Sequence, residues 1–292
     1  MRLSLSLILL VLSMKLALAA DGPARSDATP LYRVTVIQRS LQAVNYGHRS
    51  MPTNLDFRGT VLSPKSHGSA VVEAKPGAVI VRAKFGNLGP AGRFGAQYLT
   101  YVLWAVSPDG QTDRLGEIIT DHRDAAKIEV TTSYQAFGLM VTAEPYYTVS
   151  KPSSVVVLEN IVRPDTVGST ELISAKYSLL PRDENVVLDV TPRPAAVDPA
   201  PQVSQKEYEA LLALYQARNA IQIAQSERAE TYAGPALQKA ALLLRQAEQI
   251  PDRKNNSSRI VMLARQATQA AEDARSIAAV EQSRKPAETA SQ

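Results

Sequence analysis

The stretch PRPAAVDPAP, residues 192–201, divides this sequence into two parts of different character. Four prolines in ten residues favour an extended, polyproline-like backbone, which forms a semi-rigid spacer rather than part of a core. We therefore predict a proline-rich linker over residues 181–203. The part before the linker has the pattern of strands, and the part after it has the pattern of helices.

Residues 31–180 show the period-two alternation of half-buried strands. In one such run, apolar side chains at Val79, Val81 and Phe85 alternate with Arg82 and Lys84. Turn signals at residues 76–77 (PG) and 107–110 (SPDG) predict hairpins. About nine or ten short strands, with no convincing helix between them, are typical of an antiparallel β-sandwich of immunoglobulin-like architecture.

One predicted strand stands out because it is apolar on both faces. It is the run YVLWAV at residues 101–106, which holds the only tryptophan of the chain, Trp104. A strand of this kind is covered on both sides. We interpret Trp104 as a core residue rather than as part of a binding site.

After the linker, apolar residues recur at helical spacing. Ser204 and Glu207 form a capping box at the start of a first helix, and Gly234-Pro235 is predicted to end it and to start a second. The polar run 252–258 predicts a turn before a third helix of about 25 residues, about 37 Å long. We expect residues 204–282 to form an alanine-rich antiparallel three-helix bundle, followed by a disordered tail at 283–292.

The first residues predict export. Arg2, an apolar run to Met14 and the small residues 17–20 (ALAA) are typical of a signal peptide cleaved after Ala19 or Ala20. A retained membrane anchor is the weaker alternative, because Lys15 interrupts a run already shorter than the ~20 residues that span a bilayer. We predict a signal peptide at 1–20, a flexible leader at 21–30, and a periplasmic or secreted mature protein.

Composition excludes several classes of protein. Cleavage removes two of the 32 basic side chains and leaves 30 against 28 acidic ones, a net charge of +2, which does not mark a nucleic-acid-binding protein. The chain has no cysteine, so neither a disulfide nor a cysteine-linked lipid anchor is expected. Stability must come from packed cores.

The helical part resembles a known family. It is similar to an alanine-rich helical domain of unknown function found in bacterial envelope proteins, often immediately before an OmpA-type peptidoglycan-binding domain. The resemblance covers residues 205–280 and is carried by the alanines of the first helix, the segment 232–235 (YAGP), Leu237, Leu244 and the segment 271–275 (AEDAR). The OmpA-type domain itself is not in this sequence, so peptidoglycan anchoring is not carried over.

The β part resembles the N-terminal region of secreted proteins with the same helix-then-OmpA arrangement, through residues 54–60 (NLDFRGT), 94–96 (FGA) and 98–104. A shorter stretch, residues 101–104 with 108–110, 115–116 and 141–145, is also similar to the outer β domain of anti-sigma-K factors. This chain lacks the zinc-binding segment and membrane helix of those factors. Signalling across the inner membrane is therefore not expected.

The sequence contains no convincing catalytic or metal-binding motif. His48, His67 and His122 fall in predicted loops without partners at metal-ligand spacing. A glycine-rich segment contains Gly86, Gly89, Gly92 and Gly95. It is not followed by the lysine and the helix that a phosphate loop needs, so we predict a mobile or tight connection between strands. We expect no catalytic, cofactor-binding or metal-binding residue and no cofactor.

Carboxylates on or beside predicted strands leave one enzymatic alternative open. Any two of Asp56, Glu117 and Glu129 could converge as the acid pair of a glycoside hydrolase, with carboxyl groups about 5–10 Å apart in one pocket.

The leading hypothesis is a non-enzymatic periplasmic envelope protein that binds or scaffolds a partner, with the helices as spacer or assembly surface. The partner would be an envelope protein or a peptidoglycan-associated one. The alternatives are a carbohydrate-active hydrolase of the envelope and a structural protein that self-assembles through its helices.

Overall fold

Short runs of alternating apolar and polar residues form the strands of the first part of the chain. A computed structural model describes residues 36–47, 51–121, 123–166, 170–178 and 204–289. The strands are β1 (Val36–Asn45), β2 (Thr53–Gly59), β3 (His67–Lys75), β4 (Ala78–Gly86), β5 (Thr100–Val106), β6 (Thr112–Ile118), β7 (Ala126–Thr132), β8 (Ala136–Glu144), β9 (Val156–Val162) and β10 (Thr170–Ser178), with a 3-10 turn, η1 (Ala91–Phe94), before β5.

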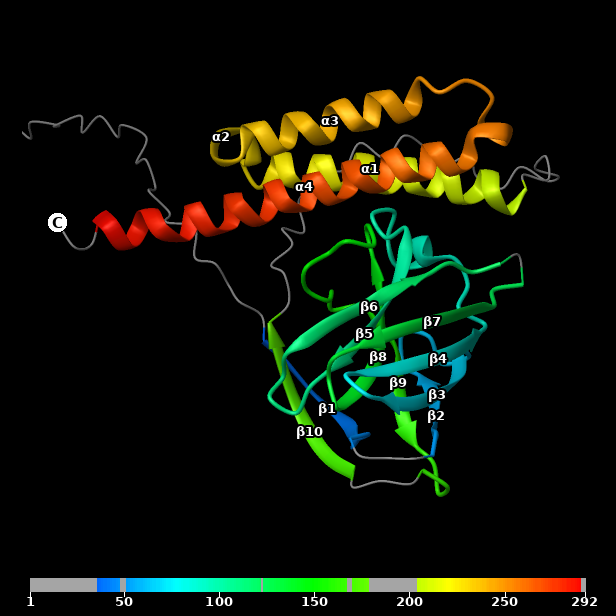
Figure 1. The fold of residues 1–292 in the computed structure, drawn as a ribbon. Coiled ribbons are helices and arrows are strands. Elements are labelled where there is room, and N and C mark those ends of the chain that lie inside the picture. The colour runs from blue at the N-terminus through cyan, green and yellow to red at the C-terminus, as the bar shows by residue number, and fades with distance from the viewer. Residues whose placement is uncertain (1–35, 48–50, 122, 167–169, 179–203, 290–292) are drawn as a thin grey trace, which may run out of the picture. The chain divides into compact units, whose positions relative to one another are not determined.

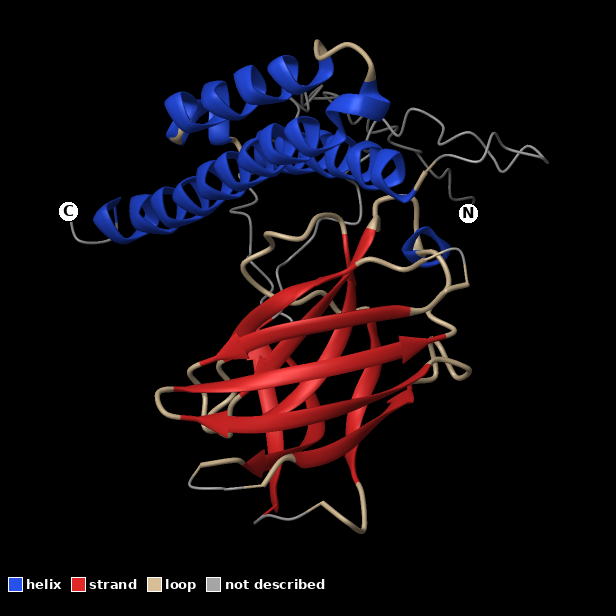
Figure 2. Ribbon diagram, turned by 45° about the vertical axis from the view of Figure 1, so that its right-hand side comes forward, coloured by secondary structure: helices blue, strands red, loops and turns tan. Residues whose placement is uncertain are grey.

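The ten strands form one antiparallel sheet (Figure 1). Its ladder runs β6-β5-β8-β9-β2-β3-β4-β7, and β1 joins the start of β8 and carries β10 on its other side. At the ends of this path, the Thr132 hydroxyl of β7 donates a hydrogen bond to the Asp113 carboxylate of β6 (2.8 Å). Gly116 permits this approach, because a Cβ there would lie 2.9 Å from Ile128 Cδ1. The sheet therefore curves into a nearly closed barrel (Figure 2).

This barrel differs from the two-sheet sandwich that the sequence predicts for residues 31–180. Alternation along a strand marks its buried face, but it does not show which strand edges meet, and the same pattern suits both architectures. The two predicted hairpins are confirmed by the β3–β4 and β5–β6 ladders. Residues 31–35 and 179–180 lie outside the described residues, as do the predicted signal peptide, leader and linker.

The strand β5 is buried along its whole length, as its apolar pattern predicts. Tyr101 and Leu103 belong to the cluster inside the barrel, whereas Trp104 belongs to a second cluster outside it. This outer cluster also contains Leu41 of β1 and alanines of the helical region, which cover the outer face of β5 and β8. Both faces of β5 are apolar because one packs inside the barrel and the other packs against β1 and the helices.

The second part of the chain is helical. Its elements are α1 (Gln205–Ser226), α2 (Ala229–Tyr232), α3 (Gly234–Glu248) and α4 (Arg253–Thr289). The capping box is confirmed: the Ser204 hydroxyl accepts from the Glu207 amide, and the Glu207 carboxylate accepts from the Ser204 amide. Pro235 stands in the first turn of α3, as predicted.

Three predicted helix boundaries are wrong. The first helix ends at Ser226 rather than at Gly234, because Arg228 takes a left-handed backbone conformation (φ 61°). The polar run 252–258 is mostly helix, since α4 begins at Arg253 directly after Asp252 (φ 47°). The third long helix has 37 residues, rather than about 25, and continues to Thr289, through most of the predicted tail.

Small residues let the long helices approach closely. Ala213 and Ala217 of α1, Ala247 of α3, and Ala264 and Ala267 of α4 share one buried cluster. The described residues of the barrel and of the helices belong to one compact unit. In the part of the chain that the structure describes, no helix is long and apolar enough to cross a membrane.

Candidate functional site

Two polar clusters join the barrel to the helices. The first, here called the Glu117 cluster, consists of Thr100, Glu117, Tyr147, Gln216 and Arg265. The second, the Glu272 cluster, consists of Tyr146, Ser150, Glu227, Glu272 and Arg275. Each combines residues of the β part with residues of α1 or its end and of α4.

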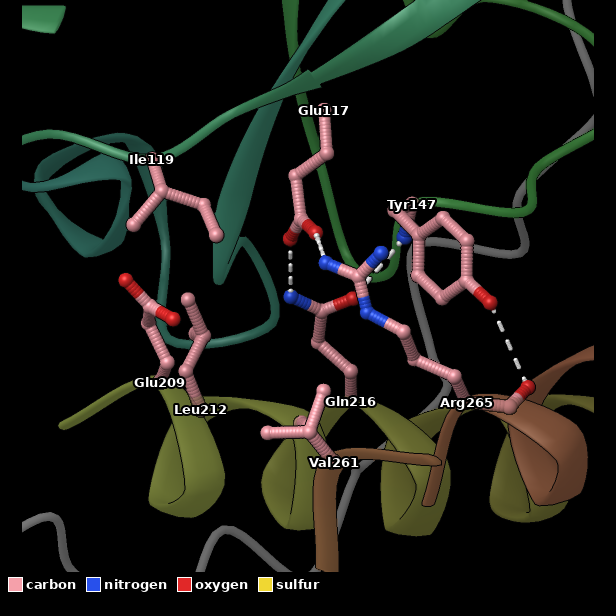
Figure 3. Close-up of a pocket in the computed structure, with 9 residues that line it drawn as sticks. Glu117, Ile119, Tyr147, Glu209, Leu212, Gln216, Val261 and Arg265 are labelled. Carbon is pink, nitrogen blue, oxygen red and sulfur yellow. Dashed lines mark hydrogen bonds and ion pairs between the residues drawn. The ribbon is translucent and has the colours of Figure 1, made fainter. Parts of the chain in front are cut away.

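The Glu117 carboxylate is the centre of the first cluster (Figure 3). Its Oε1 accepts hydrogen bonds from the Thr100 hydroxyl (2.9 Å) and from Gln216 Nε2 (2.6 Å). Its Oε2 accepts from Arg265 Nη2 (2.7 Å). The Glu117 side chain is 7% exposed and that of Arg265 is 41% exposed, so solvent screens the ion pair only from one side.

Tyr147 completes this cluster by a stacked contact. The Arg265 guanidinium carbon lies 4.7 Å from the centre of the Tyr147 ring, within the range of a cation–π interaction. The Tyr147 hydroxyl donates to the Arg265 carbonyl (3.3 Å), and the Tyr147 amide donates to Gln216 Oε1 (3.0 Å). Burial raises the pKa of the Tyr147 hydroxyl above its usual 10.0, although Arg265 acts the other way. The hydroxyl is thus a donor at neutral pH.

The Glu117 cluster forms one wall of a small pocket of about 20 Å³ that is partly open to solvent. Apolar side chains at Ile119, Leu212 and Val261 line the rest of it. Glu209 lies beside Leu212, on the opposite side of the pocket from Arg265 (Figure 3). Such a volume holds about one water molecule and is far below the range of about 300–1,000 Å³ that is usual for small-molecule sites.

The Glu272 cluster is more deeply buried. The side chains of Glu272 and Arg275, one turn apart on α4, are each 4% exposed. Glu272 accepts from the Tyr146 hydroxyl (2.7 Å) and from the Ser150 amide (2.9 Å), while Arg275 donates to the Ser150 hydroxyl (2.9 Å) and to Glu227 (3.2 Å). Glu272 and Arg275 therefore each have an opposite charge and a further partner.

Glu272 is expected to make the stability of the protein sensitive to acid. Burial raises the pKa of its carboxyl, but bonds from Arg275, Tyr146 and Ser150 outweigh burial and hold that pKa below the usual 4.5. A carboxyl with a lowered folded-state pKa contributes stability above its unfolded pKa and loses it as pH falls through the folded one. We expect the free energy of unfolding in urea to fall from about pH 5 downward, and the substitution E272Q to flatten this fall.

The matched control for the acid sensitivity is E281Q, because Glu281 forms an exposed pair with Arg284 on the same helix. Its pH profile should follow that of the wild type. Parallel profiles for E272Q and the wild type would contradict the assignment.

The three carboxylates singled out from the sequence do not converge. Glu117 lines the pocket, whereas Asp56 on β2 pairs with Arg163 and Glu129 on β7 pairs with Arg82, both at the surface. The second carboxylate of the pocket is Glu209, which the sequence did not indicate. Its Oε1 accepts from Gln205 Nε2 (3.2 Å).

The structure also describes one of the three histidines and the glycine-rich segment. The prediction that His67 lies in a loop is wrong: His67 begins β3, and its Nδ1 contacts the Lys65 carbonyl (3.2 Å). His48 and His122 lie outside the described residues. The glycine-rich segment is a tight connection between β4 and β5: Gly89 and Gly95 have positive φ angles, and η1 lies between them. In the described part of the chain, no three His, Asp or Glu side chains gather as metal ligands.

Sequence patterns alone did not lead us to predict four residues of the two clusters: Gln216, Arg265, Glu272 and Arg275. A signal was present at the last two: they stand at i and i+3 among the alanines of α4, next to the buried Ala271 and Ala274. A charged pair on an alanine stripe indicates a buried ion pair at an interface, because unpaired charges are rarely buried.

Glu117 should contribute measurably to stability. The substitution E117Q removes the charge that pairs with Arg265, so we expect the free energy of unfolding to fall by about 1–3 kcal/mol. E129Q is the matched control, because Glu129 is 62% exposed and pairs with a half-exposed Arg82. Its loss should stay under about 1 kcal/mol. If urea unfolding shows equal losses of stability for the two variants, Glu117 does not stabilise the contact between the barrel and the helices.

Comparison of the chain with protein-family models, with curated proteins and with solved structures finds no match.

Proposed function

We propose that this protein is a non-enzymatic binding or scaffolding module of the bacterial cell envelope, exported by its N-terminal signal peptide. The barrel is the binding part, and the helices, packed as a three-helix bundle, form a platform fixed to it. The observation that carries the proposal is that the two buried carboxylates between the barrel and the helices are used for structural hydrogen bonds. Glu117 and Glu272 both have their oxygens occupied by bonds that hold the helices on the barrel.

A catalytic acid or base must be able to exchange its proton with a substrate. Glu117 accepts three hydrogen bonds and Glu272 pairs with a buried arginine, so their geometry supports a structural role. The same bonds join the helices to the barrel, which supports a role as an assembly surface rather than as a spacer. Helices that are bonded to the barrel are suited to presenting a surface to a partner.

The export part of the proposal is tested by mass spectrometry of the protein recovered from the cells that make it. We expect the chain to start at Ala20 or Asp21 and to be found in the envelope or secreted fraction. Recovery of a chain that keeps residues 1–20 would contradict export by cleavage.

The binding part is tested with the purified mature chain, residues 21–292. It is incubated with isolated peptidoglycan and, separately, with envelope extract under chemical cross-linking. We expect retention on peptidoglycan or one reproducible cross-linked envelope partner, competed by excess unlabelled protein. Neither retention nor a reproducible partner would contradict the proposal.

One observation favours a second candidate, a carbohydrate-active hydrolase: Glu117 and Glu209 line the same pocket. This alternative predicts release of reducing ends from peptidoglycan or glycans. It also predicts that E209Q abolishes the release without a change in the unfolding midpoint. Such a result would replace the leading proposal, and no release by the wild-type protein would remove the alternative.

A further inference from the structure

The turn between β2 and β3 holds two apolar side chains in solvent. Val61 is 91% exposed and Leu62 is 44% exposed. Among the large apolar side chains in the described residues, Val61 is the most exposed. Single exposed apolar residues are common on protein surfaces, so the two matter only together with what surrounds them.

The turn is fixed, so the exposure of Val61 and Leu62 is built into the fold. The Thr60 amide donates to the Val157 carbonyl (3.0 Å), and the Ser66 hydroxyl donates to the Asn87 carbonyl (2.6 Å). These bonds tie the turn to β9 on one side and to the end of β4 on the other.

Gly59 allows the turn to close so tightly. A Cβ at this position would lie 2.0 Å from the Ser63 carbonyl oxygen and 2.7 Å from that of Ser66. The backbone thus folds back beneath Val61 and Leu62 and presents them outward, with little ordering left to occur on binding.

Basic side chains lie in this turn and on the outer face of the strands that follow it in the sheet. Arg58 ends the outward row of β2, Lys65 lies in the turn itself, and Lys84 stands directly opposite Lys127 across the β4–β7 ladder. All four are exposed. Here we call Arg58, Val61, Leu62, Lys65, Lys84 and Lys127 the rim patch.

Five acids lie near the rim patch. Glu159 faces Arg58 across the β2–β9 ladder, and Asp121 and Asp124 lie in the β6–β7 connection. Asp56 and Glu129 stand on the same outer face, where they pair with Arg163 and Arg82. Asp121 accepts bonds from the Arg123 and Ala125 amides, which hold it in its own turn. Arg123 and Arg93 add further positive charge beside them. The rim patch therefore keeps an excess of positive charge around its apolar tip.

We propose that the rim patch binds the surface of an anionic phospholipid membrane, with Val61 and Leu62 entering the interface and the basic side chains contacting headgroups. An apolar tip beside exposed basic side chains can bind such an interface in two ways. The apolar side chains insert into it, and the basic ones are attracted to anionic headgroups. We choose an anionic membrane as the occupant because its headgroups carry the charge opposite to these bases, and its interface is an extended apolar layer that Val61 and Leu62 can enter.

This inference goes beyond the proposed envelope function and does not rest on it. It concerns the purified protein, so vesicle binding and recovery from the envelope succeed or fail separately.

The test is co-sedimentation of the mature chain with vesicles of equal parts phosphatidylglycerol and phosphatidylcholine, and with vesicles of phosphatidylcholine alone. We expect binding to the anionic vesicles, weakened by added salt, and no measurable binding to the neutral ones. The double substitution V61S/L62S should weaken binding by roughly tenfold, because it removes apolar area that enters the interface. K84Q/K127Q should weaken it by a similar factor, about tenfold.

The matched controls carry the same changes elsewhere. L242S/M262S alters exposed apolar side chains on α3 and α4, and K206Q/K239Q alters exposed lysines on α1 and α3. Both should bind as the wild type does, and circular dichroism should show all variants folded. The proposal is overturned if the wild type does not bind anionic vesicles, if V61S/L62S binds as tightly as the wild type, or if the controls lose binding equally.

Discussion

Substitution R275M is expected to lower the free energy of unfolding by about 3–5 kcal/mol, because it leaves a buried carboxylate without its opposite charge. Glu272 and Arg275 are each 4% exposed, so water cannot take the place of the guanidinium. The measurement is urea unfolding followed by circular dichroism, in which the midpoint should fall at an unchanged slope.

Two further variants make the result specific. R284M removes an arginine whose pair with Glu281 is solvent-exposed, and it should cost less than about 1 kcal/mol. The double variant E272Q/R275M removes both charges but keeps an acceptor for Tyr146 and Ser150. It should be less destabilised than the sum of its single variants, since the two residues are coupled. A loss below about 1 kcal/mol for R275M would show that this pair does not hold α4 on the barrel.

Substitution W104A should have an effect of similar size, about 3–5 kcal/mol. Trp104 is 0% exposed, and the cluster around it joins the outer face of β5 to alanines of the helices. Its Nε1 donates to the Thr142 hydroxyl (2.8 Å), which donates in turn to the buried Glu144 carboxylate (2.6 Å). The substitution thus opens a cavity and breaks a buried chain of hydrogen bonds.

W104F separates these two contributions. It keeps most of the ring volume and loses the indole N–H, so we expect a smaller loss, about 1–2 kcal/mol. L242A at a half-exposed site of α3 is the control and should cost under about 1 kcal/mol. If W104A and L242A have equal unfolding midpoints, the outer cluster does not stabilise the contact between the barrel and the helices.

The helices show which features of the fold can be predicted from local sequence patterns. The capping box at Ser204 and the alanine stripes predicted where the helical part starts and which residues its core uses, because helix initiation and amphipathic spacing are local properties. The helix ends were less predictable. Arg228 ends α1 with a left-handed residue that is not glycine, and the run 252–258 forms the start of α4 although its composition is typical of a turn.

The strands show the same limit. The apolar pattern of residues 101–106 predicted a strand covered on both faces, and β5 is buried throughout. What covers the outer face could not be predicted, because the residues that do so lie on β1 and on the helices, far away in the sequence. Barrel closure between β6 and β7 depends in the same way on ladder register and on space at Gly116.

For the candidate site, the sequence pattern indicated Glu117 as one of three candidate carboxylates, but it did not show which of the three lines a pocket. Arg265 lies 148 residues from Glu117 along the chain, and no local pattern joins the two. The sequence by itself determined the two-part organisation, the capped alanine-rich helices and the doubly buried strand, because these follow from local spacing of side chains. The tertiary structure decided barrel closure and the two ion-pair clusters that fix the helices on the barrel, because both need contacts between residues that only the folded chain brings together.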